Sequence, residues 1–492
     1  MKKKIACLLG VVMAVSVLGG CSGSKDTTSA TGTGSQETRK ETENTSGSIE
    51  EDKSSEASGE VTKVTFWNAA SGEKVFFEGV VEEFNTTIGK ENNVEIELEH
   101  VESATSDQEL AVALQNGVAP DIFNPGSGFR EYVEKGYLTS LEDIEELSDM
   151  FSDDTPRNVG YNVWQGKLYT LPYSVTVVGL AYNKDLFKAA GIVDENGEAK
   201  APETIAEMVE DAKLLTDASK QQYGFGFPLG WGNPIFEYYV GRPAQSSNGF
   251  ISGMYDYAKG EYDFSGIKAM AEAYLQMKED GSMYPGMEGL DNDAARARFA
   301  EGNIAMMMTV SWDCAVWNDQ FPAKCDWGVA EVPVENTDKK YLQSGSVACV
   351  GAINSKGIAE GRQKAIALVY KYLYGEDMLI RRAENGMAIP YGADVVAKCD
   401  FSNSPKGWSD YCKLANITDE GHSSKQYNLD GMDDAPTEFI NKVWSGQESV
   451  DEFVEKMTKL YNEGIERFMS TADEDVVTVM NSRMDPNVDL SR

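Results

Sequence analysis

The sequence predicts an α/β protein built as two lobes. Residues 61–123 follow the order strand, helix, strand, helix, strand, from which parallel sheets are built. Residues 168–182 hold two apolar strands with no compact loop between them, as expected where a chain leaves one lobe for another. The chain has 492 residues, which is enough for two or three domains.

The composition supports sizeable cores and excludes one class of partner. The hydrophobic fraction is 41% and the aromatic fraction is 10%. The formal net charge is -36, and such an acidic surface would repel nucleic acid. We therefore expect no nucleic-acid partner.

The first 21 residues read as a targeting segment. Three lysines precede an apolar run, residues 5–18, that is too short for a typical membrane span. The run ends in Leu18-Gly19-Gly20-Cys21, which resembles a bacterial lipobox. The resemblance implies a signal peptide over residues 1–20 and lipidation, with palmitate among the acyl chains, of Cys21. The alternative is an ordinary secretory signal in which Cys21 is incidental.

Residues 21–60 are expected to form a disordered tether. After Cys21 the segment contains a single large apolar residue, Ile49, and no aromatic residue, so it cannot bury enough surface to offset ordering. As a flexible coil it would reach roughly 35 Å root-mean-square. That length suits a tether that holds a folded domain away from a membrane.

The first folded elements alternate between strands and amphipathic helices. A short strand holds Val64, Phe66 and Trp67, and a helix follows with the apolar face of residues 76–84. Strand 94–99 alternates apolar and polar residues, so one of its faces is solvated. A helix over residues 109–115 then leads to the strand of residues 117–123.

The stretch from Trp164 to Ile192 organises the rest of the chain. Strand 168–171 is expected to end at Pro172, and a buried strand follows over residues 175–182. A short helix over residues 186–190 stops at Gly191, where a left-handed cap is expected.

The second half contains further helices and strands with clear boundaries. Thr204 and Glu207 form a capping box that opens a helix, as do Ser449 and Glu452 near the C-terminus. Between them lie a Gly- and aromatic-rich segment, two helices, an apolar strand that includes Met306 to Met308, a further strand, a returning strand and an amphipathic helix. The apolar strand lies within the run from Phe299 to Trp312, and the ranges of the other elements are 224–232, 265–279, 294–300, 327–333, 345–354 and 365–373.

The motifs in this order resemble one known family. The run GKLYTLPY, then YNKDLFKAAGI, is followed by FAEGNIAM with Trp312, and by GMAIP at residues 386–390. Together they resemble the extracellular solute-binding proteins of family 1, the maltodextrin- and sugar-binding receptors of ABC importers. The resemblance covers about residues 61–469. It implies a periplasmic-binding-protein-like fold of type II, in which a ligand binds in a cleft between two α/β lobes.

The resemblance also implies three hinge crossings and a division of the chain. The crossings are expected near Val175, near residues 341–345 and near Tyr391. The first lobe would comprise residues 61–175 with a return at 343–390, and the second lobe residues 176–342 with C-terminal helices over 391–492.

Candidate ligand-binding residues follow strands or sit in Gly-rich loops. Sugars need flat aromatic rings for their apolar faces and amides or carboxylates for their hydroxyls. In open α/β sheets ligands bind outside the carboxyl ends of the strands, and the family places its ligand contacts there as well. The candidates are Trp67, Asn68, Asn124, Ser127, Tyr173, Trp231, Asn233, Trp312 and Asp313. Trp327, Trp408 and Trp444 are assigned to packing.

No catalytic residue, cofactor or metal site is expected, and the protein is not expected to be an enzyme. The sequence has no G-x-S-x-G or HExxH motif and only 2 histidines. Paired carboxylates of a glycosidase stay open, because spacing along the chain does not report their separation in space. Five cysteines remain in the folded part, of which Cys399 and Cys412 are the first pair to check for a disulfide; buried free thiols are the preferred interpretation.

We therefore expect a monomeric substrate-binding lipoprotein of an ABC transporter. It would be anchored by its lipid on the outer face of a cell membrane, at a Gram-positive-type surface. It would capture a carbohydrate, an oligosaccharide, and deliver it to the permease. Two alternatives stay open: the same fold with a phosphosugar, polyamine or peptide as ligand, or an exported glycan-active enzyme.

Overall fold

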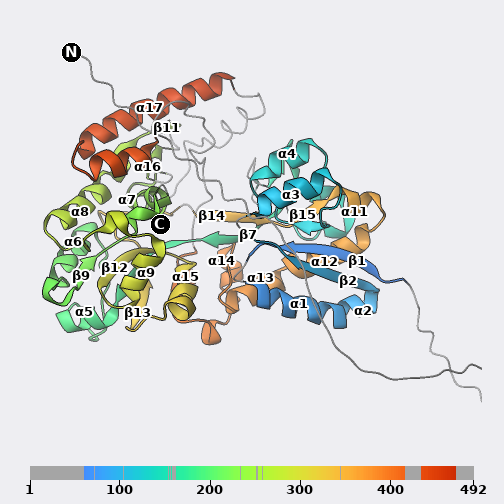
Figure 1. The fold of residues 1–492 in the computed structure, drawn as a ribbon, viewed down its shortest axis with the longest axis horizontal. Coiled ribbons are helices and arrows are strands. Elements are labelled where there is room, and N and C mark those ends of the chain that lie inside the picture. The colour runs from blue at the N-terminus through green and yellow to red at the C-terminus, as the bar shows by residue number, and fades with distance from the viewer. Residues whose placement is uncertain are drawn as a thin grey trace, which may run out of the picture. The chain divides into compact units, whose positions relative to one another are not determined.

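The computed structural model describes residues 60–70, 73–102, 105–152, 155, 157, 162–232, 234–250, 253–256, 259–343, 345–415 and 434–471. The predicted signal peptide and tether lie outside these residues. Within them the chain forms two α/β lobes (Figure 1). Among the described helices, none combines the length and the apolar character needed to cross a bilayer.

The first lobe is built on a five-stranded sheet in the order β2-β1-β3-β15-β4. Strand β1 is parallel to the edge strand β2, with Val64 opposite Ile96, and it is also parallel to β3, as the strand-helix order predicted. Strand β15 runs antiparallel to β3 and β4, so the sheet as a whole is mixed. The strands are β1 (Thr62–Asn68), β2 (Val94–His100), β3 (Ile122–Phe123), β4 (Leu138–Thr139) and β15 (Ala352–Asn354).

Amphipathic helices complete the core of the first lobe. Helix α1 buries Phe77, Val80, Val81 and Phe84, the face predicted from the sequence. Helix α12 buries Ile366, Val369 and Leu373 in the same core. The helices of this lobe are α1 (Lys74–Thr86), α2 (Ile88–Asn92), α3 (Ser106–Gln115), α4 (Phe129–Glu134), α11 (Ser355–Ala359), α12 (Gln363–Tyr374) and α13 (Glu376–Glu384).

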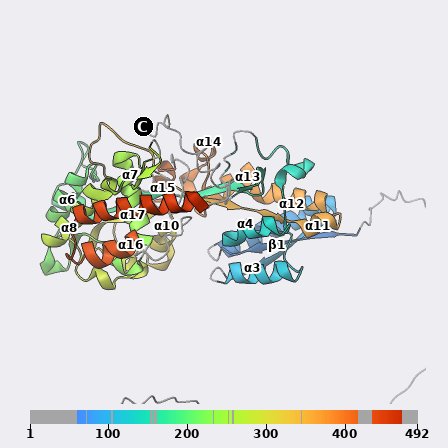
Figure 2. The same cartoon turned by 90° about the horizontal axis from the view of Figure 1, so that it is seen from above.

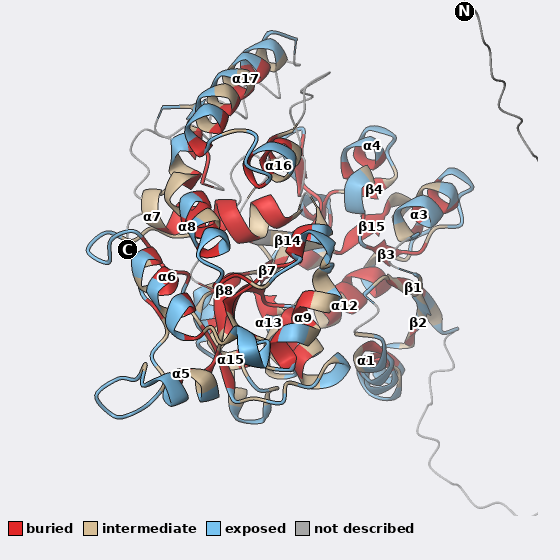
Figure 3. Cartoon of the chain, turned by 60° about the vertical axis from the view of Figure 1, so that its left-hand side comes forward, coloured by how far each residue is buried: buried red, intermediate tan, exposed pale blue. Residues whose placement is uncertain are grey.

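The second lobe has a four-stranded sheet in the order β13-β8-β12-β9. Every residue of β12 is buried, including Met306, Met307 and Met308, so the methionine run is strand core as predicted. The neighbouring strand β8 is also buried over most of its length (Figure 3). The strands are β8 (Val178–Asn183), β9 (Tyr223–Phe225), β12 (Ile304–Val310) and β13 (Trp327–Ala330).

Helices surround this second sheet. Helix α17 packs its buried face into the lobe beside α16, with Phe453 edge-on to Phe236 and Phe439 (Figures 1 and 2). Trp327, Trp408 and Trp444 are at most 3% exposed, which confirms their assignment to packing. The helices are α5 (Lys184–Ala190), α6 (Ile205–Leu214), α7 (Arg242–Asn248), α8 (Lys268–Glu279), α9 (Asn292–Ala300), α10 (Asp313–Ala315), α14 (Ala393–Val396), α15 (Trp408–Lys413), α16 (Ala435–Glu438) and α17 (Val450–Thr471).

A small third sheet, in the order β14-β7-β16, connects the two cores. Its strands are β7 (Leu171–Thr176), β14 (Ser346–Val350) and β16 (Ile389–Pro390). Strand β7 contributes Leu171 and Tyr173 to the first core and Val175 to the second. The three strands therefore supply three connections close to the positions predicted for the hinge crossings. Four further short strands form two hairpin ladders: β5 (Val163–Trp164) with β6 (Lys167–Leu168), and β10 (Tyr255–Asp256) with β11 (Glu261–Tyr262).

Strand boundaries in the hinge differ from the prediction. The strand expected over residues 168–171 is divided between β6 and β7, and the strand expected over residues 175–182 is interrupted at Val177. Pro172 was expected to end a strand, but it lies inside β7, and the break in the strand comes at Val177 instead. Opposite Pro172 the register between β7 and β14 shifts between Ala348 and Cys349. A bulge is the place where a sheet tolerates proline, because the missing N–H is not needed by a regular ladder.

Local signals in the second half are confirmed. Thr204 and Glu207 bond each other's backbone N–H groups in a capping box, and Ser449 and Glu452 do the same before α17. Gly191 caps α5 in the left-handed conformation at φ 78°. The five cysteines of the folded part, Cys399 and Cys412 included, are free thiols.

Asp211 on α6 carries a testable pH dependence. Burial, helped by the nearby carboxylates of Glu207 and Glu210, raises its pKa from 3.8 to about 6. Since the folded-state pKa is the higher one, the contribution to stability is full below the unfolded pKa of 3.8 and is lost as the pH rises through 6. Replacing Asp211 with asparagine should therefore stabilise the protein by about 1 kcal/mol at pH 7.5, allowing for solvent screening, and by much less at pH 4.

Thermal melts at the two pH values check this expectation. Glu210→Gln on the same helix is the matched control, because Glu210 is exposed and should give a smaller change at either pH. An equal gain for Asp211→Asn at pH 4 and pH 7.5 would contradict the ionisation argument.

Candidate ligand-binding site

A cavity of about 510 Å³ lies in the first lobe, beside the carboxyl ends of β1 and β3. Four residues predicted from the sequence line it: Trp67 and Asn68 at the end of β1, Asn124 directly after β3, and Tyr173 on β7. The edge of a parallel sheet where strands end is where α/β proteins bind ligands. We call this cavity the first-lobe pocket.

Trp67 presents its ring rather than its indole N–H to this pocket. The indole Nε1 donates to Glu99 Oε2 at 2.7 Å, and Glu99 is the residue directly opposite Trp67 in the register of β1 and β2. With its polar edge already bonded, the partly exposed ring is left as a flat apolar surface.

Asn68 is buried and its amide is held in one orientation. Its Oδ1 accepts from Ala70 N at 3.0 Å, and its Nδ2 donates to Ala70 O at 3.2 Å. His100 Nδ1 lies 3.3 Å from the same Nδ2, so the ring of His100 packs behind the amide. The amide of Asn68 is therefore held in one orientation at the wall of the pocket.

Tyr173 forms an enclosed wall of the pocket. Its ring lies edge-on to Tyr374 with a centroid distance of 5.3 Å, and the guanidinium of Arg382 covers it at 4.2 Å. Its hydroxyl donates to Leu373 O at 3.4 Å. Burial raises the pKa of this phenol well above its ordinary value, so Tyr173 stays neutral.

The loop after β3 is held by local hydrogen bonds. Asn124 is exposed, and its Oδ1 accepts from Gly126 N at 3.2 Å. Ser127, the other predicted residue of this loop, does not line the pocket; its hydroxyl donates to Asp107 Oδ2 at 2.5 Å, and Asp107 itself is a lining residue. Gly126 adopts a φ of 52°, a backbone conformation that other residues rarely adopt, which explains the glycine there.

Two predicted tryptophans of the second lobe meet through a third aromatic residue. Trp231 stacks on Tyr238 at 5.9 Å with an interplanar angle of 13°, and Tyr238 lies edge-on to Trp312 at 5.4 Å. Trp312 is 40% exposed, which is unusual for a tryptophan in this chain. The cluster is a partly exposed aromatic surface, and Tyr238 is a member that the sequence analysis did not identify. Asn233 lies outside the described residues.

Asp313 does not occupy the position expected of it. Its side chain is fully buried, and its Oδ1 accepts from Arg296 Nε at 2.8 Å while Oδ2 accepts from Val310 N at 3.0 Å and from Thr309 Oγ1 at 2.8 Å. These bonds fix the turn between β12 and α10 that carries Trp312. Asp313 therefore holds the turn from inside, whereas Trp312 faces outward.

Strand β7 and the residue that follows it link the aromatic cluster of Trp231, Tyr238 and Trp312 to the first-lobe pocket. Ser311, next to Trp312, donates from its backbone N to Val177 O at 3.0 Å. Val177 lies between β7 and β8, four residues after Tyr173. Four extended residues span about 13 Å, so the first-lobe pocket and the turn that carries Trp312 are attached to neighbouring points of one extended segment.

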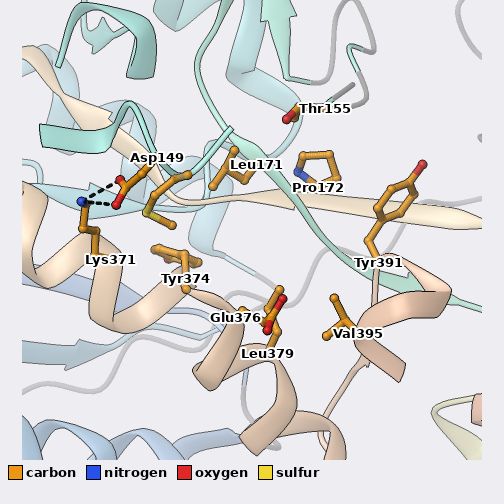
Figure 4. A pocket seen from close by; sticks show the side chains of 12 residues that line it. Asp149, Thr155, Leu171, Pro172, Lys371, Tyr374, Glu376, Leu379, Tyr391 and Val395 are labelled. Atoms are coloured by element: carbon orange, nitrogen blue, oxygen red, sulfur yellow. Dashed lines mark hydrogen bonds and ion pairs between the residues drawn. The ribbon is translucent and has the colours of Figure 1, made fainter. Parts of the chain in front are cut away.

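A second cavity, of about 490 Å³, lies against the same hinge strand (Figure 4). Leu171 and Pro172 of β7 form one side, and Lys371 of α12 pairs with Asp149 across the other at 2.6 Å. Tyr374 lines both this cavity and the first-lobe pocket. Of the predicted ligand-binding residues that the structure describes, none lines this second cavity.

Three charged residues of the first-lobe pocket were missed by the sequence analysis: Glu73, Asp107 and Arg382. Arg382 lies on α13, 309 residues from its ion-pair partner Glu73. Asp107 stands in the first turn of α3, where an acidic residue is common for electrostatic reasons alone. No local pattern marks any of the three as a pocket residue.

Comparison with known proteins places the chain in a family. The sequence profile described as bacterial extracellular solute-binding protein matches residues 70–377. The chain belongs to this family. The matched region includes residues of both cores, and the proteins of this family bind solutes.

Individual relatives of this solute-binding protein are distant. A maltooligosaccharide ABC transporter solute-binding lipoprotein of Streptococcus pneumoniae is 27% identical over 280 residues, which is 55% of this chain and 60% of that protein. An sn-glycerol-3-phosphate-binding periplasmic protein of Yersinia enterocolitica is 25% identical over 331 residues, 62% of this chain and 67% of that protein.

Solved structures share the fold of this solute-binding protein. The structure of the sugar-binding protein MalE from Xanthomonas citri aligns with this chain at a TM-score of 0.61 and 17% sequence identity. The alignment covers 84% of this chain and 100% of the MalE chain. The similarity confirms the predicted two-lobe periplasmic-binding-protein-like fold of type II.

Proposed function

We propose that this protein captures an oligosaccharide outside the cell and delivers it to the permease of an ABC importer. The observation that carries the proposal is the first-lobe pocket, where the ring of Trp67 lies beside the fixed amide of Asn68. A flat ring beside oriented donors and acceptors fits the apolar face and the hydroxyls of a sugar. The maltooligosaccharide-binding lipoprotein among the relatives agrees with this chemistry.

An oligosaccharide fits better than a single sugar, because aromatic surface is present on both sides of the hinge. Trp231 and Trp312 of the second lobe would supply a second stacking platform in addition to Trp67. A ligand that touches both lobes favours the closed arrangement by its differential affinity for it, and the permease would recognise that closed form. The strands β7, β14 and β16 are where such a motion would turn.

The protein would be held at the membrane by a lipid on Cys21. The support is the sequence Leu18 to Cys21, which lies outside the described residues. A single acyl chain binds a membrane only weakly, so stable anchoring needs more than one, at ~0.8 kcal/mol per buried methylene.

Replacing Cys21 with serine is therefore expected to move the protein out of the membrane fraction. It should appear in the medium or persist as an uncleaved precursor, because the thiol that receives the lipid is gone. Immunoblots of membrane and medium fractions measure this. A mature-sized chain that still sediments with membranes would contradict the anchor.

A second candidate ligand class is a phosphosugar, which the sn-glycerol-3-phosphate-binding relative favours. The two classes make opposite demands on charge, because a phosphate needs cationic partners. Among the described residues that line the first-lobe pocket, Arg382 is the one cation, and two carboxylates accompany it. We therefore rank the uncharged sugar first.

A thermal-shift screen tests the proposed function. The panel holds neutral mono- and oligosaccharides, phosphosugars, polyamines and peptides. A ligand that binds only the native state raises the melting temperature. At a ligand concentration of 100 times the dissociation constant, it stabilises the native state by about 2.7 kcal/mol. The proposal expects the largest shift from a neutral oligosaccharide. If only a phosphosugar, a polyamine or a peptide raises the melting temperature, the ligand is of that class and the proposed oligosaccharide is wrong. Conversion of a ligand to a product would indicate an enzyme.

A further inference from the structure

A buried ion pair forms part of the wall of the first-lobe pocket. Arg382 Nη2 donates to Glu73 Oε1, and the two side chains are 8% and 12% exposed. The guanidinium lies 4.2 Å from the ring centroid of Tyr173 and 5.7 Å from that of Phe77. Packed between two rings and paired with a carboxylate, Arg382 has a fixed position.

This pair keeps unused hydrogen-bonding capacity. Within the part of the chain that the structure describes, Arg382 Nε and Nη1 and Glu73 Oε2 have no hydrogen-bond partner. Buried polar atoms are nearly always bonded, so unpartnered atoms at a pocket wall indicate a group that arrives from outside. Two donors and one acceptor stand next to each other here.

The combination of donor and acceptor specifies the kind of group that fits. A hydroxyl accepts from an N–H and donates to a carboxylate, so neighbouring sugar hydroxyls satisfy Arg382 and Glu73 together. A carboxylate or phosphate group accepts only, and it would meet Glu73 Oε2 without a proton to share. Asp107 adds a second carboxylate, so the described lining residues carry two negative charges against the one positive charge of Arg382.

We propose that the Glu73–Arg382 pair binds hydroxyls of the ligand and makes the first-lobe pocket select uncharged sugars over their anionic derivatives. This inference rests on the proposed function, since it presumes that the pocket binds a carbohydrate. This selectivity could not be predicted from the sequence, because Glu73 and Arg382 form a pair only when α13 packs beside the start of α1.

A neighbouring ion pair supplies the matched control. Arg381 Nη1 donates to Glu83 Oε2 at 2.8 Å and joins the same two helices, α13 and α1. Its side chains are 39% and 50% exposed and do not line the pocket. Glu83→Gln therefore changes the charge between the helices without touching the proposed hydroxyl contacts.

The experiment is a calorimetric titration with two ligands. One is the neutral sugar that gives the largest thermal shift, and the other is the same sugar with a hydroxymethyl group oxidised to a carboxylate. Glu73→Gln should weaken the neutral sugar about tenfold, as expected for loss of a charged hydrogen bond. Removing the negative charge should also strengthen binding of the acidic sugar. The ratio of the affinity for the neutral sugar to that for the acidic sugar should therefore fall about tenfold or more. Glu83→Gln should leave both affinities and their ratio unchanged.

Two outcomes separate the selectivity from the function beneath it. If the unaltered protein binds sugar and Glu73→Gln keeps the wild-type ratio, the selectivity is overturned and the proposed function stands. If the unaltered protein binds no sugar in either form, the proposed function fails and the selectivity fails with it.

A double variant covers the case in which Glu73→Gln does not fold. Glu73→Gln combined with Arg382→Met removes both charges, and replacing a buried ion pair by uncharged side chains is often tolerated. The folded double variant should lose discrimination between the neutral and the acidic sugar. Retained discrimination would overturn the inference.

Discussion

Alanine at Trp312 is expected to weaken binding of the sugar about 30-fold while the protein stays folded. An aromatic anchor typically costs ~2 kcal/mol or more of binding free energy when truncated, and each ~1.4 kcal/mol is tenfold. Trp312 is 40% exposed, so its removal leaves no sealed cavity. The loss of its edge-on contact with Tyr238 should cost about 1 kcal/mol of folding free energy.

Trp444 is the matched control, because it is the same residue type in a packed position. It is 3% exposed, lies edge-on to Phe227 at 5.5 Å, and its indole Nε1 donates to Glu288 Oε1 at 2.8 Å. Alanine there should cost about 3–5 kcal/mol of stability and leave the affinity per folded molecule near normal. Each variant needs a calorimetric titration and a urea melt. Normal affinity with an early melt for Trp312→Ala would show that Trp312 belongs to the core.

Much of the fold could be predicted because its determinants are local. The alternation of apolar residues in strand β2 and the apolar face of α1 are periodic patterns, and the capping box at Thr204 and Glu207 spans four residues. Pro172 shows the limit of local reasoning. A proline favours a strand end, but the register shift opposite it in β14 removes the need for its N–H, and that shift depends on a strand far away in the sequence.

The same limit divides the site residues. Trp67, Asn68 and Asn124 could be predicted because each stands where a strand ends, and strand ends can be located from sequence. Tyr238 lies in a π-helical segment, η7 (Phe236–Gly241), and no strand end points to it. Glu73 and Arg382 meet only through the packing of α1 against α13.

Asp313 shows how a residue next to a ligand candidate can be misjudged. A carboxylate beside Trp312 after a strand matches the pattern expected for a sugar contact. The turn that follows β12 directs neighbouring side chains to opposite sides, so Trp312 is exposed while Asp313 is fully buried. Adjacent positions in the sequence therefore differ in what they can contact.

Alanine at Asp313 is accordingly expected to destabilise the protein rather than merely to weaken binding. The change would leave Arg296, which is 8% exposed, without its main partner, and would remove the acceptor of Val310 N and Thr309 Oγ1. Removing one member of a buried ion pair typically costs roughly 3–5 kcal/mol of stability, because the other charge stays buried and uncompensated. Urea melts of the purified variant measure this loss.

Asp293→Asn is the control, since Asp293 also bonds Arg296, at 3.0 Å, but its side chain is 53% exposed. Exposed ion pairs contribute about 0–1 kcal/mol, so this variant should melt close to the unaltered protein. The turn that Asp313 fixes also carries Trp312, so Asp313→Ala should lower sugar affinity as well, but only together with the loss of stability. A variant Asp313→Ala that melts normally and still loses the sugar would mean that the carboxylate turns outward to bind it, and that the buried bonds to Arg296 and Thr309 contribute little to stability.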